Sequence, residues 1–245
     1  MSKRVKIYLI FTKIGVIHID LADLKGECYN GEGDTMRLKH VQGAEKIVES
    51  SAYVIQDPKE YRGRYNEVFQ NNHPIFIEIG MGKGKFIIEN ALKYPMINFI
   101  GIEKYDSVLV RATQKIEKEI PNLRFIRMDA SSIEEVFDRE VDTIYLNFSD
   151  PWPKDRHAKR RLTSSYFLEK YDKIFKENKH IIMKTDNRHL FEYSLVSLTE
   201  YGYSICDLSL NLYEDEYLGN IATEYEEKFH AKGMPIYRVE VEKKN

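Results

Sequence analysis

Between residues 75 and 201, short apolar runs alternate with longer segments in which apolar residues recur at helical spacing. The apolar runs predict buried strands at residues 75–79, 98–103, 123–128, 142–148 and 180–184. The longer segments predict helices at residues 85–94, 106–120, 132–137 (with Ser131 as its cap), 163–176 and 188–201. Because strands separated by helix-length segments form parallel βαβ units, the pattern predicts an α/β fold with a doubly wound, mostly parallel sheet.

The segments on either side of this alternation follow other patterns. Residues 40–53 carry apolar side chains at helical spacing and predict one amphipathic helix, which is followed by a polar loop at 58–65. Residues 203–213 and 235–242 alternate like antiparallel strands, with an acidic and aromatic insert at 214–229 between them. We therefore expect antiparallel strands at the C-terminal side of the sheet.

Residues 1–35 look unlike the rest, with a strand-like alternation followed by a loose stretch that contains glycines. Read back into codons, residues 31–36 are compatible with a purine-rich ribosome-binding site just before an ATG. Two interpretations stay open. Either residues 1–35 are a translated leader and Met36 is the start, or they are a real N-terminal extension. In both cases we expect residues 36–245 to form a single domain.

Composition limits the classes of protein that the chain can belong to. A hydrophobic fraction of 42% with 31% charged residues excludes disorder as the main state. The apolar run at residues 7–11 is too short for a signal-peptide core or a membrane span, so we expect a cytoplasmic protein. The two cysteines and seven histidines show no metal-ligand spacing, and no metal is expected. The sequence leaves open whether the chain is a monomer or a homodimer.

A glycine-rich sequence of the form acid-x-Gly-x-Gly-x-Gly joins the first predicted strand to the first predicted helix. It begins at Glu78 and contains Gly80, Gly82 and Gly84, which let the backbone approach a ligand at a helix N-terminus. Lys85 stands where a nicotinamide fingerprint needs its third glycine, and the serine or threonine of a phosphate loop is missing. An acid here would repel a pyrophosphate but attract the ammonium and sulfonium of S-adenosylmethionine.

Acidic residues also end the next two predicted strands. Glu103 lies 25 residues after Glu78, where a carboxylate can accept hydrogen bonds from both ribose hydroxyls of a nucleoside cofactor. Asp129 closes the third strand, at a position suited to an adenine amino group. Each acid alone is compatible with a solvated strand end. Three such acids at successive strand ends, beside a glycine loop, indicate a cofactor site.

The sequence that follows the fourth predicted strand combines an acid, two prolines, the only tryptophan and a basic cluster. Asp150 comes just past the strand, where ligands of open α/β sheets lie, and Pro151 and Pro153 hold the loop extended. The basic residues are Lys154, Arg156, Lys159, Arg160 and Arg161. With a net charge of −2, any binding of nucleic acid must come from such a local patch. Basic side chains at an expected helix start oppose the helix dipole, which favours a phosphate ligand.

Two further segments carry candidate substrate residues. Asp186 follows the fifth predicted strand and is expected at the same edge of the sheet. Residues 223–229 place several acids beside aromatic side chains, and carboxylates can accept hydrogen bonds from guanine N1–H and its exocyclic amine. The same segment is also compatible with an ordinary amphipathic helix.

These motifs together resemble the bacterial tRNA (guanine-N7)-methyltransferase family, and the most specific of them is Ser-Asp-Pro-Trp-Pro-Lys at residues 149–154. The resemblance runs from Met36 to the C-terminus. It implies a Rossmann-like fold of the class I methyltransferase type. It also implies methyl transfer from S-adenosylmethionine to N7 of the variable-loop guanosine of tRNA, position 46 in tRNA numbering.

The resemblance further implies a role for each matching residue. The cofactor acids are Glu78, Glu103, Asp129 and Asp150, with Asp150 also at the catalytic position. The substrate-site residues are Lys154, Asp186, Thr223, Glu224, Tyr225 and Glu226. The RNA-contacting residues are Arg156, His157, Lys159, Arg160 and Arg161. Residues 1–35 match nothing in the family.

Two other classes of function remain as alternatives. A methyltransferase acting on a small molecule or a protein would keep the glycine loop and the strand-end acids, but it has no need for the basic residues 154–161. A non-catalytic RNA-binding protein on the same fold would keep the basic residues and could lose the cofactor acids, all of which are present.

Overall fold

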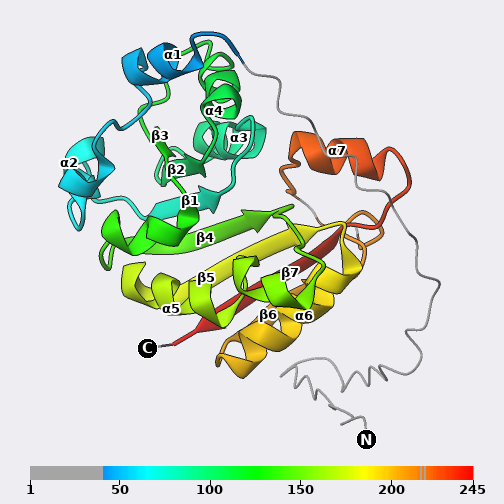
Figure 1. The fold of residues 1–245 in the computed structure, drawn as a ribbon. Helices are drawn as coiled ribbons and strands as arrows, with labels where there is room; N and C mark the ends of the chain where they lie inside the picture. Colours follow the sequence, from blue (N-terminus) through cyan, green and yellow to red (C-terminus); the bar gives the residue numbers. More distant parts are fainter. Residues whose placement is uncertain (1–40, 216, 218, 245) are drawn as a thin grey trace, which may run out of the picture. The chain divides into compact units, whose positions relative to one another are not determined.

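The computed structural model describes residues 41–215, 217 and 219–244 (Figure 1). The expected leader or extension at residues 1–35 lies outside this range, so the division of the chain at Met36 stays a prediction. No helix among the described residues is long and apolar enough to cross a membrane.

The described residues contain a sheet of seven strands in the order β3-β2-β1-β4-β5-β7-β6. The strands are β1 (Ile75–Ile79), β2 (Asn98–Glu103), β3 (Leu123–Arg127), β4 (Val141–Asn147), β5 (Phe175–Thr185), β6 (Ser204–Ser209) and β7 (Tyr237–Lys243). The first five are parallel, whereas β7 is antiparallel to both β5 and β6. The predicted doubly wound sheet with antiparallel C-terminal strands is therefore confirmed. The strand order reverses between β1 and β4, where ligands of such sheets bind.

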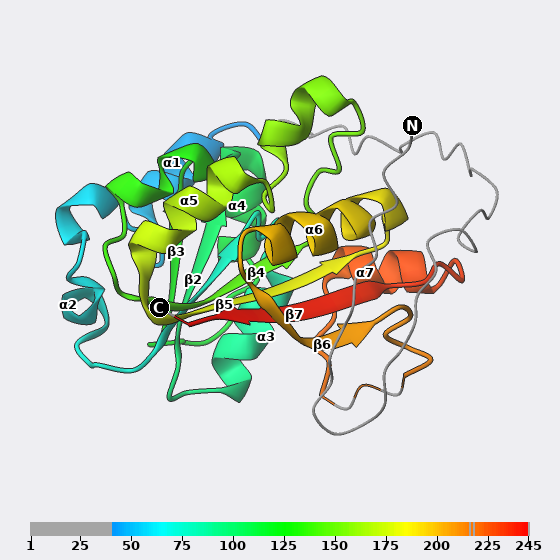
Figure 2. The same ribbon diagram turned by 90° about the horizontal axis from the view of Figure 1, so that it is seen from below.

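Helices cover both faces of this sheet (Figures 1 and 2). The α-helices are α1 (Ala44–Ser50), α2 (Tyr65–Phe69), α3 (Lys85–Lys93), α4 (Asp106–Thr113), α5 (Ser165–Ile174), α6 (Arg188–Glu200) and α7 (Glu224–His230). Three short 3-10 helices are η1 (Pro58–Tyr61), η2 (Ala130–Glu135) and η3 (Asp155–Arg160). In both views α7 lies at the end of the sheet toward which β4 and β5 run.

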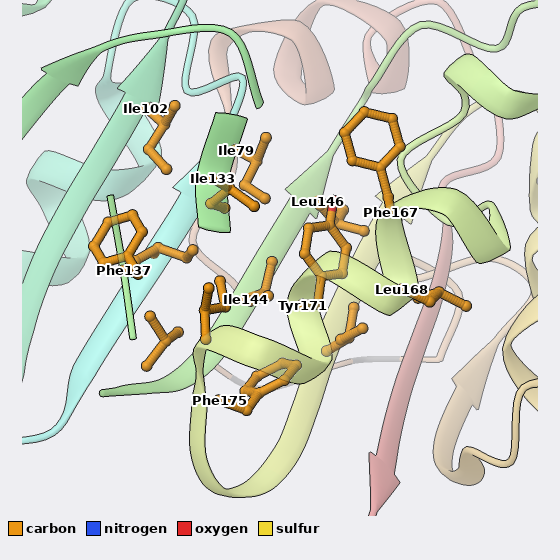
Figure 3. Packing of buried hydrophobic residues seen from close by; sticks show 14 of the residues in the cluster. Ile79, Ile102, Ile133, Phe137, Ile144, Leu146, Phe167, Leu168, Tyr171 and Phe175 are labelled. Carbon is orange, nitrogen blue, oxygen red and sulfur yellow. The ribbon is translucent and has the colours of Figure 1, made fainter. Parts of the chain in front are cut away.

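The buried side chains form two clusters, one for each face. The larger cluster packs β1, β4 and β5 against α5, α6 and η2, and Figure 3 shows its centre around Ile144, Leu146 and Tyr171. The smaller cluster packs β2 and β3 against α1, α3 and α4. Because both faces of the central strands are covered, their sequences read as continuous apolar runs rather than as an alternation.

Several helix ends differ from the sequence prediction because tertiary contacts determine them. The helix predicted at 40–53 is shorter and begins only after Gly43, which has φ 75°. The helix predicted at 106–120 ends at Thr113, whose hydroxyl donates to the Val110 carbonyl. Beyond it the chain turns toward the Tyr53 hydroxyl, which accepts from the backbone N–H of Ile120 at 2.9 Å. A side chain on a distant segment thus accepts the hydrogen bond from one backbone donor of the predicted helix.

Three other predicted segments also change. The predicted helix at 132–137 is the 3-10 helix η2, and its cap is Asp129 rather than Ser131, because the Asp129 carboxylate accepts from the backbone N–H of Ser131. The helix predicted at 163–176 gives way to β5 at Phe175, which pairs with Val141. The predicted loop at 58–65 contains η1, with proline in its first turn.

The packing of α3 against α4 predicts a cost for a side chain at Gly84. A Cβ built there would lie 2.8 Å from the Ala112 Cβ, whereas a Cβ at Gly43 would meet nothing within 4 Å. Both glycines have a positive φ, of 78° and 75°, so Gly43→Ala is a matched control for backbone strain. Gly84→Ala should lower the free energy of unfolding by about 1–3 kcal/mol more than Gly43→Ala does. Urea titration of both variants measures the difference, and equal losses would contradict the predicted overpacking.

Candidate cofactor and RNA site

The carboxyl ends of β1, β2, β4 and β5 bring the candidate residues to one edge of the sheet. The glycine loop that follows β1 is held there by its backbone, because the N–H groups of Gly80 and Met81 donate to the Ile102 carbonyl at 2.9 and 3.0 Å. Gly80 and Gly82 have φ values of 77° and 57°, and a Cβ at either would meet nothing within 4 Å. The loop therefore needs glycine for its conformation and faces open space, as a ligand cradle requires.

Glu78 lies at the bottom of this edge and is almost fully buried, with 1% of its surface exposed. One carboxylate oxygen accepts from the Asn147 side-chain amide at 2.8 Å. The other oxygen, and the amide oxygen of Asn147, have no hydrogen-bond partner among the described residues. Burial raises the pKa of Glu78 to about 8. Buried acceptors without partners are rare in folded proteins, so this pair suits a ligand that brings a donor and a positive charge.

Glu103 supports the glycine loop. Its carboxylate accepts from the backbone N–H of Gly82 at 3.1 Å, and from those of Lys104 and Tyr105 at 2.8 and 3.1 Å. Burial raises the pKa of Glu103, and the nearby charge of Asp150 contributes in the same direction. The two acids therefore lie close enough to interact. Glu103 occupies the predicted end of β2, and a carboxylate with three backbone donors keeps further acceptor capacity for a hydroxyl.

Asp129 is more exposed and lies in a different environment. Its carboxylate binds the Lys104 ammonium at 2.6 Å and caps η2 through the Ser131 N–H at 2.9 Å. The hydrogen bond from Lys104 lowers the pKa of Asp129 to about 2. Asp129 is thus charged at neutral pH and lies past β3, as the sequence predicts.

The loop that carries Asp150 has an unusual backbone. Phe148 and Trp152, on either side of the exposed Asp150, have positive φ values of 50° and 44°. Such conformations cost of order 1–3 kcal/mol each in residues with a side chain and need support from their surroundings. Arg161 supplies that support, because its guanidinium donates to the carbonyls of Pro151 at 3.1 Å and Trp152 at 3.0 Å.

Arg161 therefore differs from the other basic residues of this segment. The residue is 9% exposed, and its guanidinium packs 4.2 Å from the centre of the Tyr193 ring. The sequence placed Arg161 among the residues that contact RNA. In the structure its hydrogen bonds hold the Asp150 loop, and its contact with RNA stays a prediction. A cluster of like charges in a sequence does not reveal which member turns inward.

Of the remaining basic residues, Lys154 precedes η3 and the others lie on it, and here the dipole argument from the sequence is wrong. The segment forms a 3-10 helix in which His157, Lys159 and Arg160 occupy the last turn, where positive charge is favourable. The exposure of the basic side chains supports the expected RNA-contacting surface more directly than the dipole argument does. The exposed basic residues are Lys154, Arg156, Lys159 and Arg160. The Arg160 guanidinium lies 4.7 Å from the centre of the Trp152 ring, and His157 meets that ring edge-on at 5.8 Å.

Residues 223–229 comprise the N-cap Thr223 and most of α7 (Glu224–His230), which begins with a capping box. The Thr223 hydroxyl accepts from the Glu226 N–H at 2.9 Å, and the Glu226 side chain accepts from the Thr223 N–H. Tyr225 packs against Phe148, with ring centres 5.1 Å apart and the ring planes tilted by 41°, and thus joins α7 to the Asp150 loop. Glu224 forms ion pairs with Lys83 and Lys115. These four side chains of the predicted substrate set therefore also hold the helix in place.

Two predicted substrate residues are wholly or partly buried. Glu226 is 0% exposed, and its carboxylate pairs with the Lys184 ammonium at 2.5 Å. Asp186 is half-buried just past β5, and burial raises its pKa. Among the described residues, no group of three or more histidine, cysteine or acidic side chains could hold a metal ion.

Asn147 and Lys184 have no role predicted from the sequence, yet the structure places both in the site. Both are polar residues that end apolar strands, and both are at least 95% buried. The sequence could have identified them by that position, because a polar side chain at the end of a buried strand either meets solvent or faces a ligand pocket.

The chain is similar along most of its length to proteins of known family. A family model described as "Putative methyltransferase" matches residues 72–239. The tRNA (guanine-N(7)-)-methyltransferase of Lachnoclostridium phytofermentans is 53% identical over 207 residues, which are 83% of this chain and 97% of that protein. The protein of the same name from a Geobacillus species is 54% identical over 209 residues, which are 84% and 95% of the two chains.

Solved structures share the fold at low identity. The structure of an antibiotic-related methyltransferase has a TM-score of 0.60 at 19% identity and covers 76% of this chain and 94% of its own. The 16S rRNA (adenine(1408)-N(1))-methyltransferase of Catenulisporales acidiphilia, solved with the cosubstrate SAM, has a TM-score of 0.54 at 9% identity, with 77% and 92% covered. The sheet order and these neighbours are those of class I methyltransferases.

The raised pKa of Glu78 predicts how stability depends on pH. Because the folded chain holds this proton more tightly than the unfolded chain, the carboxyl stabilises the fold at low pH. That contribution is lost as the pH rises from about 4.5 through about 8. The melting temperature of the wild type should therefore fall relative to that of Glu78→Gln over this range. Glu49→Gln, at an exposed glutamate of α1, reports the effect of the same replacement at the surface. Parallel curves for wild type and Glu78→Gln would argue against the shift.

Sequence, fold and site agree on one assignment: this chain belongs to the tRNA (guanine-N7)-methyltransferase family.

Proposed function

We propose that this chain transfers a methyl group from S-adenosylmethionine to N7 of a guanosine in tRNA, at position 46 of the variable loop. The names of its relatives support tRNA as the substrate. The observation that carries the proposal is the Asp150 loop, which follows β4, is bound by Arg161 and leads directly into the exposed basic residues of η3. Cytoplasmic location follows from this substrate.

The residues at the edge of the sheet fit the cofactor. Glu78 offers a buried carboxylate oxygen without a partner among the described residues, which suits the ammonium of the methionine part. We assign Glu103 to the ribose hydroxyls, Asp129 to the adenine amino group, and the glycine loop to close approach of the backbone; the open space at Gly80 and Gly82 supports this assignment. When bound, S-adenosylmethionine supplies an activated methyl group on a cationic sulfur.

Methyl transfer to guanine N7 needs little acid–base catalysis from the protein. Guanine N7 carries a lone pair and no proton, so the site needs alignment and a surrounding that tolerates positive charge on the purine. Asp150 meets that need, because its carboxylate is exposed at the end of β4 and the loop around it is held by Arg161. As the base becomes cationic, the attraction of Asp150 for it increases, and such an interaction lowers the barrier.

The basic surface fits the phosphates of an RNA. Lys154, Arg156, Lys159 and Arg160 are exposed on one short segment, and the chain has a net charge of −2. The attraction is therefore local and directs the RNA backbone to the side of the Asp150 loop.

Replacing Asp150 with asparagine should lower kcat by about 10²-fold or more, because it removes one preorganised charge and keeps the shape. Raising the pH should give no rescue, since the nucleophile loses no proton. Asp155→Asn, at an exposed acid of η3, should leave kcat near that of the wild type and serves as the control. A near-normal kcat for Asp150→Asn at saturating tRNA and cofactor would remove Asp150 from the catalytic role.

The double replacement Lys159→Ala/Arg160→Ala should weaken tRNA binding and flatten its salt dependence. The slope of log K against log salt should change by up to about 0.9 for each duplex phosphate that the variant no longer neutralises, and by less for single strands. Arg161→Ala should instead lower the melting temperature, because the Asp150 loop then lacks two hydrogen bonds. Filter binding of tRNA across a salt series compares the double variant with Arg161→Ala. A salt slope that is unchanged in the double variant contradicts the proposed surface.

One assay separates this function from its alternatives. Tritiated methyl transfer to unmodified tRNA, followed by nucleoside analysis, should yield N7-methylguanosine. The same tRNA with position 46 changed to adenosine should accept no label. Label on a protein or small molecule, with none on tRNA, supports a different methyltransferase. Binding of tRNA without transfer supports a non-catalytic RNA-binding protein.

A further inference from the structure

Three polar side chains stand in a row across neighbouring strands on the face of the sheet that α3 covers. Asn147 binds Glu78 through its amide at 2.8 Å and pairs in register with Lys184 of β5. The residues two positions earlier on the same strands, Phe76, Tyr145 and Ile182, line a cavity of about 200 Å³ beside α3. Because side chains alternate along a strand, Glu78, Asn147 and Lys184 share this face.

Lys184 directs its hydrogen bonds toward α7 and the segment that leads into it. Its ammonium donates to the Asn220 side-chain oxygen at 3.1 Å, the Ile221 carbonyl at 2.9 Å and the Glu226 carboxylate at 2.5 Å. Three donors are the full capacity of an ammonium, and the side chain is only 3% exposed. Lys184 therefore joins the sheet to the α7 segment.

Glu226 completes this arrangement from α7. Its carboxylate is 0% exposed and also accepts from the Tyr213 hydroxyl at 3.2 Å and the Asn220 amide at 2.5 Å. Removing one partner of such a pair leaves a buried charge that seeks another partner.

Glu78 is the other buried carboxylate near Lys184. Burial raises the pKa of Glu78 and lowers that of Lys184, and the opposite charge of each group opposes the shift of the other. Asn147, which binds Glu78 and pairs in register with Lys184, connects the two groups. Lys184 is thus a cation between two buried acids. Its hydrogen bonds include one to Glu226, and one oxygen of Glu78 stays without a partner among the described residues.

We propose that Lys184 is a positioning residue that links the docking of α7 to cofactor affinity. While α7 is docked, Glu226 holds the Lys184 ammonium and leaves Glu78 free for the cationic cofactor. When α7 is displaced, the ammonium turns to Glu78, neutralises it and weakens cofactor binding. This inference rests on the proposed cofactor site.

Ion pairs at the other side of α7 strengthen the link. Lys83 of the glycine loop pairs with Glu224 at 3.5 Å, and Lys85 at the start of α3 pairs with Glu227 at 2.9 Å. Lys85 also donates to the Ala222 carbonyl at 3.1 Å. The helix that carries the candidate substrate residues is therefore tied both to the glycine loop and to the row beneath it.

A rescue experiment tests the proposal. Glu226→Gln should weaken S-adenosylmethionine binding about tenfold or more, a common size for coupling between sites. Adding Lys184→Met to Glu226→Gln should restore the affinity, because the competing cation is gone. A merely structural role predicts that the double variant binds as weakly as the single one or more weakly, and that result would overturn the proposal. Calorimetry measures affinity, and melting temperatures show that each variant folds.

A second readout needs no cofactor. In protein labelled with carbon-13 at glutamate carboxyls, the pKa of Glu78 should fall in Glu226→Gln and rise again in the double variant. An unchanged pKa in Glu226→Gln would overturn the proposal. Glu134→Gln, alone and with Lys170→Met, is the matched control, because this lysine–carboxylate pair joins η2 to α5. Failure of the wild type to bind S-adenosylmethionine would refute the proposed cofactor site and leave the titration result readable.

Discussion

Charged side chains buried at the ends of apolar strands need partners, and this requirement organises one edge of the molecule. Lys184 and Glu226 satisfy each other with both side chains at most 3% exposed, which fixes α7 against the sheet. Glu78 satisfies only half of its capacity through Asn147. The same environment thus contains one ion pair whose hydrogen bonds are satisfied and one carboxyl group that has an oxygen without a partner among the described residues. The ion pair determines structure, and the carboxyl group is what makes the edge a binding site.

The Asp150 loop shows a related dependence on one side chain. Two aromatic residues adopt left-handed backbone conformations there, and Arg161 binds the carbonyls of Pro151 and Trp152. The arginine thus binds a proline-containing loop that the sequence predicted to be extended but that turns at Phe148 and Trp152, and Asp150 stays exposed. Because the neighbouring basic side chains remain on the surface, the loop can present its acid and its cations to one substrate molecule.

The sequence predicted the ends of β1 to β4 within about one residue, since buried runs such as Ile75–Ile79 read as continuous apolar segments. It placed the start of β5 five residues too late, because residues 175–179 carry the polar sequence that precedes the apolar run. The prediction from sequence was wrong where contacts with distant segments determine the end of an element. The end of α4 depends on the Tyr53 hydroxyl, which no local pattern encodes. The positions of candidate acids also followed from strand ends. The sequence did not show which charged side chains are buried. Arg161 and Glu226 have the same local pattern as their exposed neighbours, and only the packing of the folded chain distinguishes them.

The single tryptophan of the chain lies in this loop, two residues past Asp150. Its ring is half-buried, with the Arg160 guanidinium over it and the His157 ring at its edge. The intrinsic tryptophan fluorescence of the protein therefore comes from one place, beside the candidate catalytic acid and the basic surface. The chain carries its own optical reporter, and its emission follows the loop without any added label.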